Sequence, residues 1–267
     1  MKVQVLLSCI NQVDFSILDE SNIQTSAIVV NQCGKNEVNE FEYKGEKIKF
    51  ISLASKGVGI SRNTALINAD ENIVLFADDD VHYYDGYEDL IVQEFEKHPE
   101  ADMICFNFKY LNQMRPGVYT DKFKRVSWMN CMRYGTYKMA VKRDKIMKNR
   151  IAFSLLFGGG SRFGSGEDSF FISDCIKSGM KVFASPVCLG TVEQKESTWF
   201  FGYNEKYYRD KGAFWAAYGK KLWPFYSIYY LIKNQKQIMK SEFSLFRAFQ
   251  LMAQGAEEYR NPLKSEM

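Results

Sequence analysis

The sequence predicts an α/β fold: a mostly parallel, Rossmann-like sheet flanked by helices, followed by an aromatic-rich helical C-terminal region. Short β-branched runs alternate with helical patterns through the first half, which is typical of a parallel sheet covered on both faces. The composition changes near residue 195, and 14 of the 32 residues from 199 to 230 are aromatic. We expect a catalytic domain over 1–195, with halves 1–109 and 110–195, and a basic, aromatic helical region over 196–267.

The spacing of apolar residues predicts the individual elements. Apolar runs bounded by polar clusters indicate strands, and apolar residues three and four apart indicate helices. The expected strands are 3–9, 27–31, 48–54, 73–77, 102–108, 136–141 and 181–188, and the expected helices are 61–69, 86–98, 167–177 and 243–253.

The composition excludes several classes of protein. The chain has 267 residues, 46% hydrophobic and 25% charged, which is ordinary for a globular protein. A net charge of +3 argues against a nucleic-acid partner, and two histidines exclude a histidine-rich zinc site. Six cysteines without a CxxC pair indicate a reduced, cytoplasmic protein. No apolar run reaches the ~18 residues of a membrane span.

Three consecutive aspartates, Asp78, Asp79 and Asp80, follow the apolar run 73–77. Ligands of open α/β sheets bind outside the carboxyl ends of the strands, so these carboxylates lie where a ligand is expected. Their hard oxygen donors suit Mg²⁺ or Mn²⁺, which are held by one or two carboxylates together with ligand phosphates. The alternative is a solvated loop or a cap of the following helix.

A glycine-containing segment, Gly57–Asn63, precedes that strand. Its glycines allow a close approach of the backbone, and Ser61 is a suitable helix N-cap. Arg62 would then lie in the first helical turn, where it can meet a phosphate. The alternative is an ordinary surface cation.

These motifs together resemble the GT-A glycosyltransferases of family 2. The resemblance is carried by Gly57–Asn63, by Asp78–Asp80 as the D-x-D motif, and by the pair Glu167 and Asp168 in Gly166–Phe171. It spans about residues 1–195. It implies a GT-A fold, a nucleotide-sugar donor and a divalent cation as cofactor.

The resemblance also implies roles for single residues. Asp78 and Asp79, with Arg62, would bind the nucleotide-sugar, and Asp80 would bind Mn²⁺ or Mg²⁺. Asp168 would be the general base of an inverting transfer, with Glu167 beside it. Such a transfer needs a base within reach of the acceptor hydroxyl. The alternative for Asp168 is a carboxylate that stabilises the helix N-terminus.

The sequence departs from the family pattern at two places. The carboxylate usual after the second strand is missing, and Asn31 or the adjacent Gln32 would contact the nucleotide base instead. The histidine usual after the last strand is absent, and Glu193 is the nearest candidate metal ligand. On the acceptor side, the candidates are Gly159, Gly160 and Trp199.

The C-terminal region combines lysines with aromatic residues. Lysines flank the apolar run 222–232, which suits a segment in a membrane interface beside anionic lipids. We expect a cytoplasmic protein, peripheral on the inner membrane. The alternatives are a helical subdomain packed on the catalytic domain and a homo-oligomer interface.

The leading functional hypothesis is a glycosyltransferase that moves a sugar from a UDP-sugar to a glycan or lipid-linked acceptor in bacterial surface polysaccharide synthesis. A sugar-1-phosphate nucleotidyltransferase is a second hypothesis, but its basic glycine-rich loop should follow the first strand. Residues 8–12 there contain neither glycine nor a basic residue. A catalytically silent carbohydrate-binding module is the third, and it would need neither acidic motif.

Overall fold

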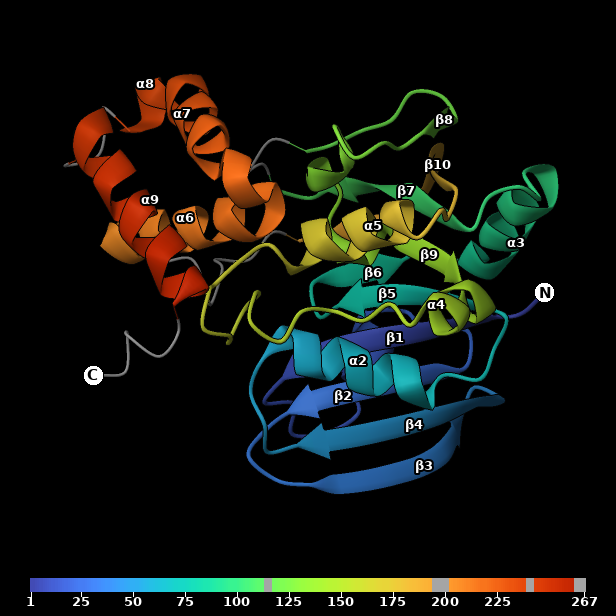
Figure 1. The fold of residues 1–267 in the computed structure, drawn as a ribbon. Helices are drawn as coiled ribbons and strands as arrows, with labels where there is room; N and C mark the ends of the chain where they lie inside the picture. Colours follow the sequence, from blue (N-terminus) through green and yellow to red (C-terminus); the bar gives the residue numbers. More distant parts are fainter. Residues whose placement is uncertain (113–116, 194–201, 239–242, 262–267) are drawn as a thin grey trace. The chain divides into compact units, whose positions relative to one another are not determined.

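The computed structural model describes residues 1–112, 117–193, 202–238 and 243–261 (Figure 1). The chain forms two compact units. One unit comprises Met1–Leu155 with Glu167–Lys195, and the other comprises Leu156–Gly166 with Glu196–Met267. The loop Leu156–Gly166 is thus grouped with the C-terminal helices, whereas the sequence places it in the half 110–195.

A mixed sheet of ten strands forms the centre of the first unit, among the residues that the structure describes (Figure 1). Four strands from the first 78 residues are parallel, as predicted, in the order β4, β2, β1, β5. β9 then lies antiparallel between β5 and β7, and β7 is parallel to β10. Their bounds are β1 Val3–Ile10, β2 Ala27–Gln32, β4 Glu46–Leu53, β5 Ile73–Asp78, β7 Met103–Tyr110, β9 Met139–Lys142 and β10 Val182–Val192.

Three strands at the periphery were not predicted. β3 (Glu37–Tyr43) forms an antiparallel hairpin with β4, and four of its seven residues are charged or amide side chains, which hides the apolar alternation. β6 (Val81–Tyr83) and β8 (Lys124–Arg125) pair antiparallel with β10. Both are too short to give a periodic signal.

Helices cover both faces of the sheet. Alternate residues of a strand point to opposite faces, and β1 follows this rule: Val5 and Leu7 join one core cluster, and Leu6 joins the other. The first cluster includes residues of α1 (Ile17–Glu20) and α3 (Tyr87–Lys97). The second includes residues of α2 (Val58–Asn68), α4 (Arg143–Asn149) and α5 (Glu167–Lys177). The predicted α/β architecture is confirmed.

Two local predictions were wrong in detail. The strand expected over 136–141 begins with a 3-10 turn, η2 (Thr136–Lys138), after the turn η1 (Cys131–Arg133). Ser61 is not an N-cap, because α2 begins earlier, after Gly57 at φ 125°. The Ser61 hydroxyl donates instead to Ser8 Oγ at 2.9 Å, which ties α2 to β1.

The second unit is helical, as predicted. Asn204 and Ser244 cap two of its helices by accepting a hydrogen bond from the backbone N–H three residues later. No helix of the described residues is long and apolar enough to span a bilayer. The elements are α6 Glu205–Gly219, η3 Lys220–Leu222, α7 Trp223–Lys233, α8 Gln235–Ile238 and α9 Leu245–Arg260, and their core holds Tyr208, Leu231, Ile238, Ala248, Leu251 and Met252.

Helices α6 and α9 touch backbone to backbone at two glycines. A Cβ on Gly212 would lie 1.8 Å from the Met252 carbonyl oxygen, and one on Gly255 would lie 1.8 Å from that of Arg209. We expect Gly212→Ala to lower the free energy of unfolding of this unit by about 1–3 kcal/mol, because neither backbone can move aside locally. Urea unfolding followed by circular dichroism measures the effect.

The control is Gln254→Ala, at an exposed position of α9, which we expect to change stability by less than about 0.5 kcal/mol. Alanine favours a helix over glycine by about 1 kcal/mol, so without a steric clash Gly212→Ala should stabilise α6. A Gly212→Ala variant as stable as the wild type, or more stable, would therefore contradict the close contact.

Candidate active site

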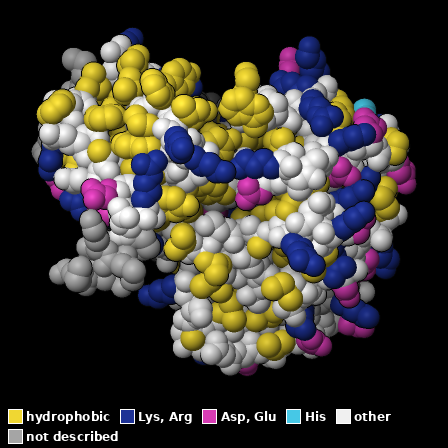
Figure 2. Space-filling view, viewed as in Figure 1, with side chains coloured by type: hydrophobic (Ala, Val, Ile, Leu, Met, Phe, Trp, Pro, Cys, Tyr) yellow, Lys and Arg dark blue, Asp and Glu magenta, His cyan; other side chains and the backbone are white. Residues whose placement is uncertain are grey.

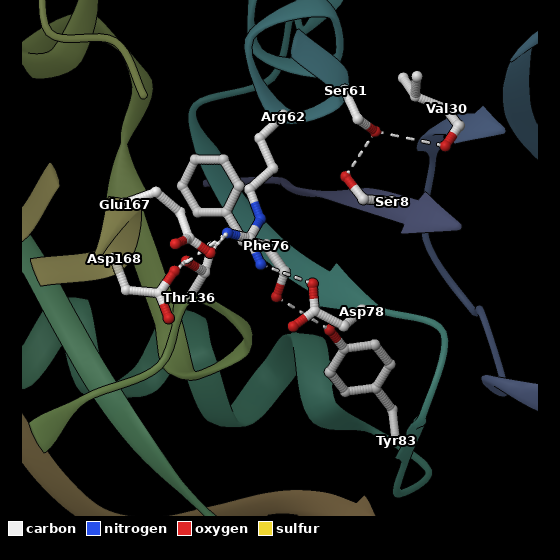
Figure 3. Close-up of polar contacts among 10 residues, drawn as sticks. All are labelled: Ser8, Val30, Ser61, Arg62, Phe76, Asp78, Tyr83, Thr136, Glu167 and Asp168. Atoms are coloured by element: carbon white, nitrogen blue, oxygen red, sulfur yellow. Dashed lines mark hydrogen bonds and ion pairs between the residues drawn. The ribbon is translucent and has the colours of Figure 1, made fainter. Parts of the chain in front are cut away.

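The candidate site lies at the carboxyl edge of the parallel strands, where α/β sheets bind ligands. Asp78 is the last residue of β5 and pairs in register with Ser8 of β1. Figure 3 shows Arg62 extending from α2 toward this edge, with Asp78 on one side and Glu167 and Asp168 on the other. The structure therefore brings together the three motifs that the sequence singles out.

Arg62 is the centre of this cluster and is only 4% exposed. Its Nη2 donates to Asp78 Oδ1 at 2.8 Å. Its Nη1 donates to Glu167 Oε1 at 3.1 Å and to Asp168 Oδ1 at 3.0 Å. One guanidinium thus joins carboxylates from β5 and from the first turn of α5. Arg62 is therefore not the surface cation of the alternative interpretation, and a direct contact between Arg62 and a nucleotide stays a prediction.

The electrostatics of the cluster follow from its burial. Desolvation works against the charge of Arg62, but the carboxylates of Asp78, Asp168 and Glu167 hold its pKa above the ordinary value. Burial raises the pKa of Glu167 to about 7, and the neighbouring Asp168 adds to the rise while Arg62 opposes it. A proton on Glu167 therefore removes one of the negative charges that share a single buried cation.

This raised pKa predicts a stability profile. The unfolded-state pKa of Glu167 is near 4.5 and its folded pKa is about 7, so the folded protein binds more protons between these values. The stabilisation is fully present below the unfolded pKa and is lost as pH rises through about 7. We expect the wild type to lose free energy of unfolding, relative to Glu167→Gln, as pH is raised from 5 to 8.

Urea unfolding across this pH range tests the expectation. Glu96→Gln, at an exposed position of α3, is the matched control and should follow the wild-type profile. Parallel profiles for the wild type and Glu167→Gln would show that Glu167 does not bind the extra proton.

Asp168 has two donors on one oxygen. Arg62 Nη1 and the Thr136 hydroxyl both donate to its Oδ1. Among the described residues, no hydrogen bond reaches its Oδ2. The side chain is 30% exposed, so the carboxylate is fixed in orientation by its inner oxygen and remains accessible to solvent. The role of Asp168 as general base, which further needs the acceptor hydroxyl within hydrogen-bond reach, stays a prediction.

Three residues near the acids were missed by sequence reasoning. Thr136 orients Asp168, and the hydroxyls of Tyr137 and Tyr110 lie 2.8 Å apart. Burial raises the pKa of Tyr137 above its ordinary range, with contributions from Tyr110, Asp80 and Asp78. The segment that holds Thr136 and Tyr137 reads as a plain strand, so no sequence signal marks them as neighbours of the acids.

Asp80 and Glu193 come from distant parts of the chain and lie next to each other. The backbone N–H of Glu193 donates to the Asp80 carbonyl oxygen at 3.0 Å. No group of three histidine, cysteine or acidic residues among the described residues is placed to hold a metal ion. Mg²⁺ and Mn²⁺ need only one or two carboxylates when water and substrate phosphates complete their coordination, so a cation site at Asp80 and Glu193 stays a prediction.

Asn31 has a structural role that the sequence does not indicate. It is 1% exposed, and its amide accepts from the Gln12 N–H at 3.0 Å and donates to the Gln12 carbonyl at 2.9 Å. The neighbouring Gln32 accepts from the Gly57 N–H at 2.6 Å. These amides fix the loops after β1 and before α2. A direct contact of Asn31 with a nucleotide stays a prediction.

The remaining candidates are placed as follows. Asp79 is half-buried behind β5, and after burial it is the main contributor to the raised pKa of Cys9. Gly159 is buried and Gly160 is exposed, and both belong to the helical unit. Trp199 lies outside the described residues. The acceptor roles of Gly159, Gly160 and Trp199 stay predictions.

Comparison with known proteins identifies the family. The model of the family "Glycosyl transferase family 2" matches residues 5–157, more than half of the chain. The chain belongs to glycosyl transferase family 2. The matched segment contains Arg62 and the three aspartates, while Glu167 and Asp168 lie beyond it. The predicted resemblance and the predicted class of enzyme are confirmed.

Solved structures show the same fold. The S. aureus TarS 1–349 crystal structure has a TM-score of 0.55 at 14% identity, over 100% of this chain and 73% of that one. Its complex with UDP-GlcNAc has a TM-score of 0.58 at 16% identity, over 99% and 73%. Its complex with UDP has a TM-score of 0.55 at 16% identity, over 99% and 72%. These likenesses confirm the GT-A fold of this family 2 glycosyltransferase. No curated protein sequence matches the chain.

Proposed function

We propose that the protein transfers a sugar from a UDP-sugar to a hydroxyl of a glycan acceptor, with inversion at the anomeric carbon and with Mn²⁺ or Mg²⁺ as cofactor. The observation that carries the proposal is the Arg62 bridge, which holds Asp78 of the D-x-D motif beside Glu167 and Asp168. The structural likeness to TarS, solved with UDP-GlcNAc and with UDP, supports UDP as the nucleotide.

On the donor side, the proposal assigns the aspartates after β5. Asp78 and Asp79 would bind the nucleoside and sugar of the donor. Asp80 and Glu193 would hold the cation, which when bound stabilises the negative charge of the leaving diphosphate. Arg62 would act on the donor through Asp78, because its guanidinium nitrogens Nη1 and Nη2 are already bonded to carboxylates.

On the acceptor side, the proposal assigns Asp168 as the general base. Its Oδ2 would take the proton of the acceptor hydroxyl while the oxygen of that hydroxyl bonds to the anomeric carbon. The bond between that carbon and the diphosphate oxygen breaks on the opposite face, which inverts the configuration. Thr136 and Arg62 orient the carboxylate through Oδ1. A protonated Glu167 would leave more of the Arg62 charge to Asp78 and Asp168.

The biological setting belongs to the proposal as well. We expect a glycan or lipid-linked acceptor of bacterial surface polysaccharide synthesis, reached from the cytoplasmic face of the inner membrane. Acceptors of this kind are presented at a lipid surface, which suits a protein with a basic, aromatic helical unit.

Calorimetric titration with UDP, with and without Mn²⁺, tests the donor site, with GDP and dTDP as comparison nucleotides. We expect UDP to bind more tightly when Mn²⁺ is present, and Asp80→Ala to lose this gain. Asp174→Ala, at an exposed position of α5, should bind as the wild type does. Preference for GDP or dTDP would contradict the UDP assignment. Absence of binding by every nucleotide would refute the proposed activity and favour the silent module.

A further inference from the structure

Helix α7, together with Leu222 at the end of the preceding turn η3, carries an apolar stripe on its solvent-facing side. Exposed side chains recur at positions 222, 225, 229 and 232, which are three or four residues apart and so share one helix face. Figure 2 shows hydrophobic side chains gathered over the part of the helical unit where Figure 1 places α7. The stripe consists of Leu222 (55% exposed), Phe225 (71%), Tyr229 (63%) and Ile232 (59%).

The opposite side of α7 packs inside the helical unit. Ser227 and Leu231 are buried, and Leu231 belongs to the core of the helical unit. The hydroxyl of Tyr230 is hydrogen-bonded to the hydroxyl of Tyr207 in α6. The helix therefore has one face that packs inside the unit and a second apolar face that faces solvent. Monomeric proteins rarely expose a continuous apolar patch of this kind unless it binds something.

The charged residues of the segment that carries the stripe all have the same sign. Lys220 and Lys221 precede the stripe, and Lys233 and Lys236 follow it; all four are exposed. From residue 211 to residue 241 the sequence contains no acidic residue. Within the described part of the chain, none of these four lysines forms an ion pair with a carboxylate. An apolar stripe with cations at both ends matches the interface of a bilayer that contains anionic lipids.

The same charge distribution argues against a second copy of the chain as the occupant. Most homodimers use one patch against itself across a two-fold axis. Two copies of this stripe would bring eight lysines together, and the segment 211–241 supplies no carboxylate to pair with them. A lipid surface has no such conflict, because its headgroups supply the negative charge.

We propose that α7 binds in the plane of an anionic bilayer surface, with the stripe Leu222, Phe225, Tyr229 and Ile232 among the lipid chains and the four lysines at the headgroups. The inference specifies the surface that contacts the membrane and does not depend on the proposed reaction. Sedimentation with vesicles of phosphatidylglycerol and phosphatidylcholine in equal parts, compared with pure phosphatidylcholine, measures the binding.

The wild type should sediment with the anionic vesicles, and high salt should weaken the binding. The double variant Phe225→Glu/Ile232→Glu should bind at least about tenfold more weakly, because two large apolar side chains no longer leave water. Ile67→Glu is the control: it removes an isoleucine that is also exposed, at 70%, from α2 of the other unit. This control should bind vesicles as the wild type does.

The lysines give an independent readout. Each replacement of Lys220, Lys221, Lys233 or Lys236 by glutamine should weaken binding to the anionic vesicles by about fivefold. The inference is overturned by failure of the wild type to bind anionic vesicles, by equal binding to neutral vesicles, or by equal loss in Ile67→Glu. A concentration-dependent dimer in solution that Phe225→Glu/Ile232→Glu abolishes would assign the stripe to a second copy.

Nucleotide titration separates this inference from the proposed function. The double variant should bind UDP as the wild type does, because Phe225 and Ile232 are exposed side chains outside the catalytic unit. Vesicle binding without any nucleotide binding would remove the proposed reaction and leave the membrane surface in place. Nucleotide binding without vesicle binding would refute the membrane surface and leave the proposed reaction in place.

Discussion

Replacing Asp168 with asparagine is expected to lower kcat by about 100- to 10,000-fold while leaving UDP binding unchanged. The amide cannot take the proton of the acceptor hydroxyl, and general-base catalysis contributes a factor of this size. Its oxygen can still accept from Thr136 and Arg62, which now donate to Oδ1, so the side chain should stay in place. Steady-state transfer rates and calorimetric UDP binding measure the two effects.

Asp174→Asn is the matched control, since it makes the same chemical change at an exposed position of the same helix. It should keep wild-type turnover. If Asp168→Asn loses UDP binding together with turnover, Asp168 is part of the donor site and is not the base. If turnover survives in Asp168→Asn, the base is another residue.

Replacing Arg62 with methionine is expected to lower the free energy of unfolding by about 3–5 kcal/mol. The side chain is 4% exposed and is the shared partner of three carboxylates. Removing one partner of a buried ion pair leaves uncompensated charge, and the cost is of this size. Urea unfolding at neutral pH measures it, with Arg133→Met at an exposed position of η1 as the control.

The stability lost in Arg62→Met should be larger at high pH than at low pH. Arg62 opposes the rise in the pKa of Glu167, so without the guanidinium burial and the neighbouring Asp168 raise that pKa further above its unfolded value. The folded variant then binds more protons than the unfolded chain, so its stability recovers as pH falls and declines as pH rises. A destabilisation that is equal at pH 5 and pH 8 would show that lost packing, rather than unpaired charge, is its cause.

The sequence predicts the parallel strands and their helices well, because their apolar patterns are local. It does not predict β9 between β5 and β7, since the order of strands depends on contacts between distant segments. The same limit applies to the site. The motif that contains Arg62 is visible in the sequence, but its partners Glu167 and Asp168 lie 105 and 106 residues further along the chain.

Site residues that belong to a local sequence motif were therefore easier to predict than site residues whose role depends on tertiary contacts. Three adjacent aspartates behind an apolar strand are visible in the sequence and favour a ligand site over a solvated loop or a helix cap. Nothing in the sequence shows that the Asn31 side chain is hydrogen-bonded to the backbone of Gln12 or that Thr136 orients Asp168. Both contacts form only in the folded protein.

The position of β9 has a consequence for dissecting the enzyme into fragments. A fragment that ends near residue 109 would keep β5 and β7 but lose the strand hydrogen-bonded between them. The same fragment lacks β10, the other neighbour of β7, so β5 would expose one edge and β7 both edges, and such edges can pair with other chains. The same cut would leave the buried Arg62 with Asp78 alone. The halves 1–109 and 110–195 thus form one cooperative folding unit, and we expect neither to be obtainable as a stable, separately expressed module.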